Sequence, residues 1–462
     1  MTRGPRPSGR PASFRTGDAE REAKIAAAPG LRARIAAQQI IADVLSGGHA
    51  LDERFEPTAV PSRTAGLDDR DRGLARSIAT VALRRLGAIR RAQAQLLDRG
   101  LPRNCGQVEW ILIAGLAQVL FLDTPDHAAV DLAVRATRLE ARTAGLAGLV
   151  NATLRNAARR RDELIALADP LADETPAWLA QRWRRNWGAQ ALAIAQAHLL
   201  EPTLDLTVRG DAQEWARRLD GVVLPTGSVR LLAHTPVPEL EGYADGQWWV
   251  QDAAAALPAM LLKPSPGQTA LDLCAAPGGK TAQLAAAGCE VTALDRSAER
   301  LKTLSANLER LRLHADLVVA DAASWNAGPF DLVLVDPPCS ATGTIRRHPD
   351  VRWTKKAGDI ESLVAAQTRI LANAARLLKP GGALVYCTCS IEPEEGEHQI
   401  AQLLRRDPEL KRAPIAPGEC GISPDMLTPE GDLRTLPSHW PNDNPRLAGI
   451  DGFFAARLRK QG

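Results

Sequence analysis

Apolar residues recur along this chain with two different spacings. From Leu31 to about Ala168 they follow helical spacing, as Ile35, Ile40 and Ile41 do. The stretch 108–122 is apolar nearly all round, which predicts the buried central helix of a bundle. We therefore expect residues 31–168 to form one all-α domain.

From residue 261 onward, apolar strands alternate with helical segments. "TALDLC", "EVTALD", "FDLVLVD" and "GALVYCT" have the character of strands, and segments such as "ESLVAAQTRILANAARLL" lie between them. Strands that alternate with helices indicate βαβ units. Residues 261–462 are therefore predicted to form a doubly wound, Rossmann-like α/β domain.

Two further segments lie outside these patterns. Residues 169–260 hold a Trp-bearing helical stretch and short strand-like pieces between turn-rich segments, which predicts a small α+β module. Residues 1–30 are rich in Pro, Gly, Ser and Arg and lack apolar periodicity, so we expect a disordered basic tail.

Charge is unevenly distributed. Residues 1–162 hold 26 Lys/Arg and 17 Asp/Glu, a balance of +9, whereas the remainder holds 31 and 37, a balance of −6. A basic N-terminal third suits a polyanionic partner such as RNA.

The cysteines and the longest apolar runs exclude several classes of protein. The seven cysteines include no CxxC pair, so we expect reduced thiols and no metal site. No apolar run is long enough to span a membrane, and no signal peptide opens the chain. We expect a cytoplasmic monomer.

A cofactor site is predicted where the first strand of the α/β domain ends. "LDLCAAPGGK" runs from a strand into Gly278 and Gly279, which permit a tight turn close to a ligand. Asp295, Asp321 and Asp336 end the next three strands and would share the same rim. A ribose-bearing cofactor explains these acids, and S-adenosylmethionine fits because neither a dinucleotide nor a phosphate-loop fingerprint is present.

Two cysteines follow strands at that rim, Cys339 in "DPPCSATG" and Cys389 in "YCTCS". A thiolate that adds to carbon 6 of cytosine makes carbon 5 nucleophilic enough to accept a methyl group. Asp336 is the candidate acid for that addition. The pattern does not rank the two cysteines, and Cys387 lies deeper in its strand, where we expect a structural role.

At these residues the chain resembles the NOP/Sun family of RNA cytosine-5 methyltransferases. The specific motifs are "LDLCAAPGGKT", "DPPCSATGTIRRHPDVRW" and "TCSIEPEE", in this order. "DHAAVDLAVRATR" and "LAGLVNATLRNAARR" resemble NusB-type RNA-binding domains. The resemblance covers residues 31–459 and implies methylation of 16S rRNA. Arg209 is a departure, because the family usually has asparagine there.

The resemblance also implies a role for each matching residue. Cys389 would be the nucleophile, and Cys339 would assist release of the product. Apart from the resemblance, Arg346, Arg347 and His348 follow the Cys339 loop, where we expect them to clamp RNA phosphates, with a solvated loop as the alternative. The implied cofactor contacts are Cys274, Ala275, Ala276, Pro277, Gly278, Gly279, Lys280, Asp295, Arg300, Asp321 and Asp336.

Three rival functions remain at this point. The amino-methyltransferases also have a DPP start, but an aromatic residue follows it, whereas Cys339 follows it here. The same cytosine chemistry on tRNA or another RNA is a second alternative. A non-catalytic RNA-binding factor of ribosome assembly is the third, and the intact cysteine pair argues against it.

Overall fold

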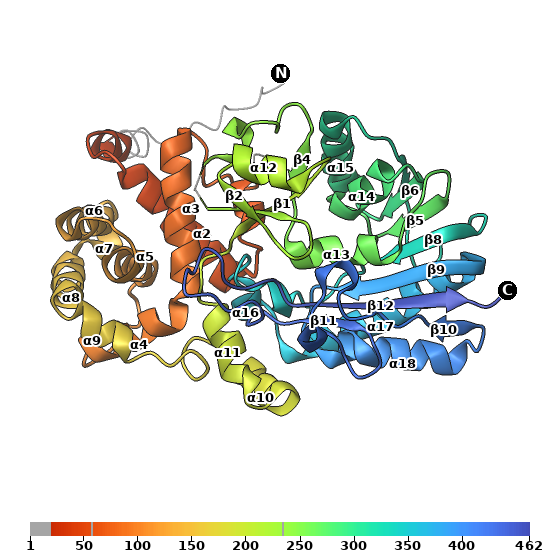
Figure 1. Cartoon of the computed structure of the whole chain (residues 1–462). Coiled ribbons are helices and arrows are strands. Elements are labelled where there is room, and N and C mark those ends of the chain that lie inside the picture. Colours follow the sequence, from red (N-terminus) through yellow and green to blue (C-terminus); the bar gives the residue numbers. More distant parts are fainter. Residues whose placement is uncertain (1–19, 57–58, 233–234) are drawn as a thin grey trace, which may run out of the picture. The chain divides into compact units, whose positions relative to one another are not determined.

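The computed structural model of the chain describes residues 20–56, 59–232 and 235–462 (Figure 1). It divides into two compact units that meet at Pro176 and Ala177. Residues 169–176 thus belong to the first unit, and the module expected at 169–260 is not a separate body. Among the residues described, no helix is both long enough and apolar enough to cross a bilayer.

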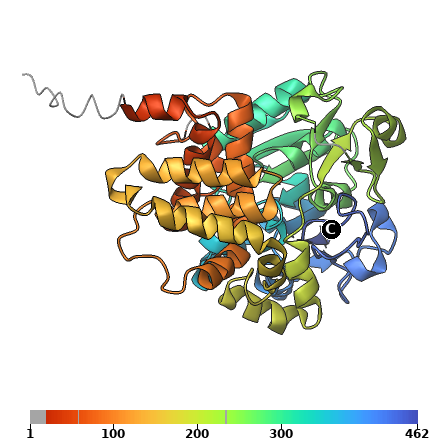
Figure 2. The same cartoon turned by 90° about the vertical axis from the view of Figure 1, so that its left-hand side faces the viewer.

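The first unit is helical. Its helix α5 (Val108–Phe121) is buried along almost its whole length and contacts helices α2, α3, α6 and α8, which confirms the predicted central helix. Figure 2 shows its helices packed against one another. The elements are α2 (Leu31–Gly47), η1 (Asp52–Phe55), α3 (Asp69–Arg84), α4 (Leu86–Leu96), α5, α6 (Asp126–Arg138), α7 (Ala141–Ala144), α8 (Ala147–Arg159) and α9 (Arg161–Ala166).

The expected disordered tail is wrong in part. Residues 20–26 are helical, because Ile25 and Ala28 find apolar partners and are buried. The other residues of that predicted tail, 1–19, lie outside the described part of the chain.

The second unit begins with two helices and a small antiparallel sheet. The sheet has the strand order β2-β3-β1-β4. Leu206, Trp215 and Trp248 form its core with the helix α12. The elements are α10 (Ala177–Trp187), α11 (Gln190–Ala197), β1 (Leu204–Val208), α12 (Ala212–Arg218), β2 (Gly221–Val223), β3 (Val229–Leu231), η2 (Val237–Glu239) and β4 (Trp248–Val250).

The larger sheet of this unit has the order β10-β12-β9-β8-β5-β6-β7, and β11 pairs with β12. Neighbours from β9 to β7 run parallel, as the alternating pattern predicts. Strand β12 runs antiparallel to β9, so the sheet is mixed. The strands are β5 (Thr269–Leu273), β6 (Glu290–Asp295), β7 (Asp316–Val319), β8 (Phe330–Val335), β9 (Leu378–Thr388), β10 (Leu410–Arg412), β11 (Leu433–Thr435) and β12 (Phe453–Lys460).

Helices cover both faces of this sheet, and two separate apolar cores result. One core holds Leu257 and Leu304, and the other holds Leu371 and Tyr386. The helical elements are α13 (Ala253–Leu261), α14 (Gly279–Ala286), α15 (Ala298–Leu311), η3 (Thr342–Thr344), α16 (Val351–Thr354), α17 (Ala357–Arg376), η4 (Pro393–Glu395), α18 (Glu397–Arg406), η5 (Glu419–Gly421) and η6 (Pro424–Met426). The arrangement confirms the predicted doubly wound class.

The parallel order gathers the candidate residues at one edge. Cys274 follows β5, Asp295 ends β6, Asp336 follows β8 and Cys389 follows β9. Open α/β sheets bind their ligands outside the carboxyl ends of their strands. At the far side of the sheet, β7 is an edge strand, and Leu317 and Val319 on it are exposed.

Candidate active site

A cavity of about 540 Å³ lies at this edge of the sheet. It is lined by the loop after β5, by the starts of α13 and β12, and by residues that follow β8 and β9. Eleven of the predicted site residues line it: Cys274, Ala275, Ala276, Pro277, Gly278, Gly279, Lys280, Asp336, Arg347, His348 and Cys389.

The two cysteines at the strand ends face each other. The Sγ atoms of Cys339 and Cys389 are 3.3 Å apart, and both residues are half-buried. Their chain segments run together, because the Gly343 amide donates to the Cys389 carbonyl at 3.0 Å and the hydroxyls of Ser340 and Ser390 are 3.0 Å apart. Both thiols therefore belong to one site.

The surroundings of the Cys339 thiol favour its protonated form. The hydrogen bond with Cys389 raises the pKa of Cys339 well above its ordinary value, and burial acts in the same direction. Cys339 therefore keeps its proton and can donate it to the Cys389 sulfur, which lines the cavity. Cys387 is fully buried, and that burial raises the pKa of its thiol.

Asp336 forms an ion pair at the wall of the cavity. Its Oδ2 accepts a hydrogen bond from Lys280 Nζ at 2.6 Å, and Lys280 Nζ lies 5.3 Å from the centre of the Phe453 ring. Burial lowers the pKa of Lys280, but the charge and hydrogen bond of Asp336 together with the nearby Cys387 and Asp272 outweigh it, and the pKa is raised. Lys280 is therefore a fixed cation that holds the Asp336 carboxylate in place.

The loop between β5 and α14 is shaped by its backbone. Cys274 and Gly278 have positive φ values of 65° and 104°. A Cβ on Gly278 would lie 2.7 Å from Leu304 Cγ, so only glycine fits without a shift. The turn brings the N-terminus of α14 to the cavity, where its amide groups favour a polar ligand.

Asp295 and Arg300 hold this loop in place through hydrogen bonds to Ala276. Asp295 Oδ2 accepts from the Ala276 amide at 3.3 Å and from Arg300 Nη1 at 3.2 Å, and Arg300 also donates to the Ala276 carbonyl. Asp321 is exposed and caps the Ala323 amide at 2.9 Å. Asp295, Arg300 and Asp321 are not among the residues that line the 540 Å³ cavity.

Sequence reasoning missed Asp272, which lines the cavity from inside β5. Its Oδ2 accepts from Thr281 Oγ1 at 2.6 Å, and its buried Oδ1 finds no partner among the described residues. Burial raises its pKa to about 7. The signal was present in the sequence, since a carboxylate in the middle of an apolar strand is unusual.

The three residues predicted to contact phosphates differ in how far they are exposed. Arg346 is only 1% exposed and bonds to Asp451 at 2.8 Å and Asp252 at 3.1 Å, so it is not presented to a phosphate. Arg347 bonds to the same two carboxylates and to the Thr203 carbonyl. His348 is exposed at the cavity.

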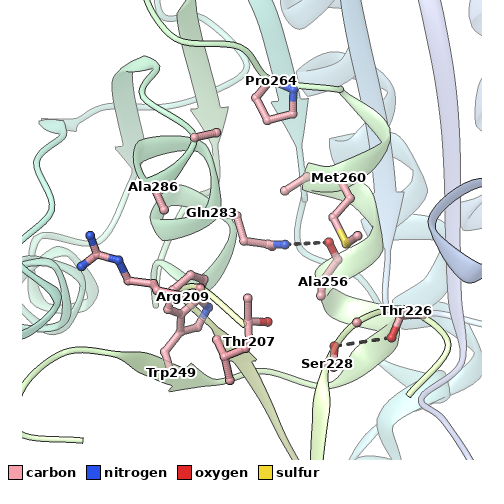
Figure 3. Close-up of a pocket in the computed structure, with 15 residues that line it drawn as sticks. Thr207, Arg209, Thr226, Ser228, Trp249, Ala256, Met260, Pro264, Gln283 and Ala286 are labelled. Atoms are coloured by element: carbon pink, nitrogen blue, oxygen red, sulfur yellow. Dashed lines mark hydrogen bonds between the residues drawn. The ribbon is translucent and has the colours of Figure 1, made fainter. Parts of the chain in front are cut away.

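A second cavity of about 570 Å³ lies between the small sheet and helices α13 and α14 (Figure 3). Trp249 lines both cavities. Figure 3 shows the Arg209 guanidinium directed away from Gln283 and Met260, and its Nη1 donates to the Leu311 carbonyl at 2.9 Å. Arg209 therefore ties the small sheet to the end of α15.

Comparisons with known proteins agree with this site. Residues 259–459 match the family described as 16S rRNA methyltransferase RsmB/F, and residues 31–159 match the NusB family. The ribosomal RNA small subunit methyltransferase B of Xanthomonas campestris pv. campestris is 38% identical over 84% of this chain and 91% of its own. The same-named protein of Xylella fastidiosa (strain Temecula1) is 36% identical over 93% of this chain and 98% of its own.

A solved structure described as NSun6 from Pyrococcus horikoshii with SFG shares the fold, with a TM-score of 0.53 and 19% identity over 62% of this chain and 98% of its own. The relatives are similar across both units of the chain, and the family match includes the loop after β5 and both facing cysteines. This chain therefore belongs to the RsmB/F family of 16S rRNA methyltransferases.

Proposed function

We propose that this protein transfers a methyl group from S-adenosylmethionine to carbon 5 of a cytosine in 16S rRNA, through a covalent bond between Cys389 and carbon 6. The observation that carries the proposal is the pair of thiols, 3.3 Å apart, beside the cavity at the strand ends. A methyltransferase acting on an exocyclic amine would need no such pair. A cytoplasmic location follows from the proposed substrate.

The residues around the cavity suit S-adenosylmethionine. Asp272 Oδ1, which has no partner among the described residues, offers a ligand a hydrogen-bond acceptor. The N-terminus of α14 at Gly279 offers it amide donors. We infer that the loop 274–280 and Asp336 hold the cofactor, with Asp295, Arg300 and Asp321 at its margin. The bound cofactor supplies an electrophilic methyl group on a sulfonium centre.

The chemistry of the chain's own residues begins at Cys389. Its thiolate adds to carbon 6 of cytosine, a C–S bond forms, and carbon 5 becomes nucleophilic. The proton that the Cys389 thiol loses passes to the third ring nitrogen by way of the Asp336 carboxylate, which Lys280 holds in place. The Cys339 thiol donates a hydrogen bond to the Cys389 sulfur.

Release of the product reverses the addition. A base removes the proton from carbon 5, the electron pair forms the double bond between carbons 5 and 6, and the C–S bond breaks with its electrons returning to Cys389. The third ring nitrogen returns its proton to Asp336. Cys339 assists this step, because a thiol within hydrogen-bond distance stabilises the departing thiolate. His348 and the NusB-like helical unit are the proposed contacts to RNA.

Transfer of a labelled methyl group to isolated 16S rRNA tests the proposal, followed by bisulfite sequencing to locate 5-methylcytosine. Cys389→Ala should lower the rate by about 10³-fold or more. Cys105→Ser, in the helical unit, is the matched control and should keep the rate. Labelling of tRNA but not of rRNA, or full activity of Cys389→Ala, would contradict the proposal.

Cys339→Ala separates the two thiols. We expect a covalent protein–RNA species to accumulate, visible on a denaturing gel, because adduct formation continues while release slows. If that species fails to form, Cys339 has no part in release.

A further inference from the structure

A carboxylate next to the thiol pair has no role in the chemistry described so far. Glu395 ends the turn η4, is fully buried, and is not among the residues that line the cavity. Its Oε1 accepts from the Ser340 amide and from Gln367 Nε2, each at 2.9 Å, and its Oε2 accepts from the Ser340 hydroxyl. Both oxygens therefore bind the residue that follows Cys339.

The backbone of Glu395 is tied to the strand that carries the other cysteine. Its carbonyl accepts from the Tyr386 hydroxyl at 2.8 Å and from Thr388 Oγ1 at 3.5 Å, and both donors lie on β9, which ends immediately before Cys389. One residue thus joins the two segments that bear the thiols.

The charge of Glu395 is unusual for a residue that serves only packing. It forms no ion pair within the described part of the chain, and its side chain is bound by neutral donors alone. A buried carboxylate without a cation is costly. Glu392, in the same segment and equally buried, bonds instead to Arg182 at 2.8 Å and to Trp183 at 3.2 Å.

We propose that Glu395 is a positioning residue that keeps the Cys339 thiol within reach of Cys389, by clamping Ser340 against the end of β9. The catalytic meaning of this clamp rests on the proposed function, whereas the spacing of the two sulfurs does not. Release of Ser340 frees the loop after β8, and the sulfurs then spend less time close together. A displacement of about 1 Å at a reacting group lowers a rate by as much as about 100-fold.

The spacing of the sulfurs can be measured without RNA or cofactor. Diamide oxidises the two thiols to a disulfide and takes up both hydrogen atoms, becoming a hydrazine. We expect the full-length protein to form the Cys339–Cys389 disulfide readily, as a cross-linked peptide in mass spectrometry. Glu395→Ala should form it at least about tenfold more slowly, since bonds to a charged acceptor are lost. Glu395→Gln should be intermediate, because its amide oxygen still accepts from the Ser340 amide.

Glu392→Ala is the matched control, since it removes an equally buried carboxylate of the same segment that bonds to Arg182 and Trp183 and not to Ser340. The amide of residue 392, which bonds to Ser390, is kept. Its cross-linking rate should equal that of the unaltered protein. Circular dichroism establishes that each variant is folded. If Glu395→Ala does not fold, Ser340→Ala removes only the hydroxyl contact and should slow cross-linking by a smaller factor.

Two results would overturn the proposal: an unchanged or faster rate in folded Glu395→Ala or Ser340→Ala, or an equal slowing in Glu392→Ala. The cross-linking outcome stands even if the unaltered protein methylates no RNA, so it is separable from failure of the proposed function. Where methylation is found, Glu395→Ala should lower kcat and leave the affinity for S-adenosylmethionine unchanged by calorimetry.

Discussion

The two compact units place their charged side chains differently. In the helical unit, many ion pairs are exposed, such as Arg135 with Asp131, whose side chains are 53% and 55% exposed, although Arg85 pairs with the fully buried Glu174. In the second unit, the guanidinium of Arg230 and the carboxylate of Asp205 are both fully buried. The pairs of Arg346 with Asp252 and Asp451 are buried almost as deeply.

This difference shows what the buried charges contribute. A buried ion pair gives little net stability, because desolvation offsets the attraction, whereas loss of one partner is strongly destabilising. The pairs of Arg346 and Arg347 join the loop after Cys339 to the starts of α13 and β12, all at the cavity. We infer that the second unit uses buried charge to fix the geometry of its site.

The largest expected effect comes from Asp252→Ala. It removes one of the two carboxylates that the Arg346 and Arg347 guanidinium groups share, and we expect the free energy of unfolding to fall by about 3–5 kcal/mol. Urea denaturation measures it. Asp131→Ala in the helical unit is the control and should cost less than about 1 kcal/mol. Equal losses in both variants would remove the distinction between the units.

Gly343→Ala should have the next largest effect. A Cβ at this position would collide with the carbonyl oxygen of Gly452, and the Gly343 amide holds the Cys389 carbonyl. We expect a loss of about 1–3 kcal/mol in the free energy of unfolding from overpacking, together with slower methyl transfer. Thermal denaturation and a methylation assay give the two values. Unaltered stability would show that the segments around Gly343 and Gly452 can move apart at no cost in free energy.

Asp272 gives the second unit a dependence on pH. Its folded pKa is about 7, against an ordinary value of 3.8, so the folded chain holds a proton that the unfolded chain has lost between these values. Stability therefore falls as pH rises from about 4 to about 7. Between these pH values, we expect the unaltered protein to lose at least about 1.4 kcal/mol more of its free energy of unfolding than Asp272→Asn does, which is the equivalent of one pKa unit. Parallel curves of unfolding free energy against pH for the two proteins would contradict this.

The smallest effect has the opposite sign. Gly148 lies in helix α8, and a Cβ there would meet no atom within 4 Å. Gly148→Ala should raise the free energy of unfolding by about 0.4–1 kcal/mol, because alanine restricts the unfolded chain and favours helix. A rise in the melting temperature tests it. A fall in the melting temperature would mean that a side chain at position 148 meets a steric conflict that its open surroundings do not indicate.

Local pattern was enough to predict the features that depend on neighbouring residues. The apolar run of α5 predicts its burial, and the apolar strands that end at Asp336 and Cys389 predict the rim of the sheet. A parallel order then brings these ends together without further information.

Features that depend on distant partners were not predictable in this way. Arg346 finds Asp252 and Asp451 at separations of 94 and 105 residues, so its burial depends on how α13 and β12 meet the loop after β8. The antiparallel placement of β12 beside β9 likewise depends on the tertiary arrangement of the C-terminal segment. The helical residues 20–26 were missed because their few apolar side chains pack against a core that the local composition does not reveal.

Strand β7 has a practical consequence for handling the protein. Its outer backbone groups and the exposed side chains of Leu317 and Val319 offer a template on which a strand of another molecule can assemble. Asp316, exposed at the start of the strand, supplies the charge that opposes such assembly. Concentrated samples should therefore aggregate first along this border, and Leu317→Lys is the substitution to make before crystallisation.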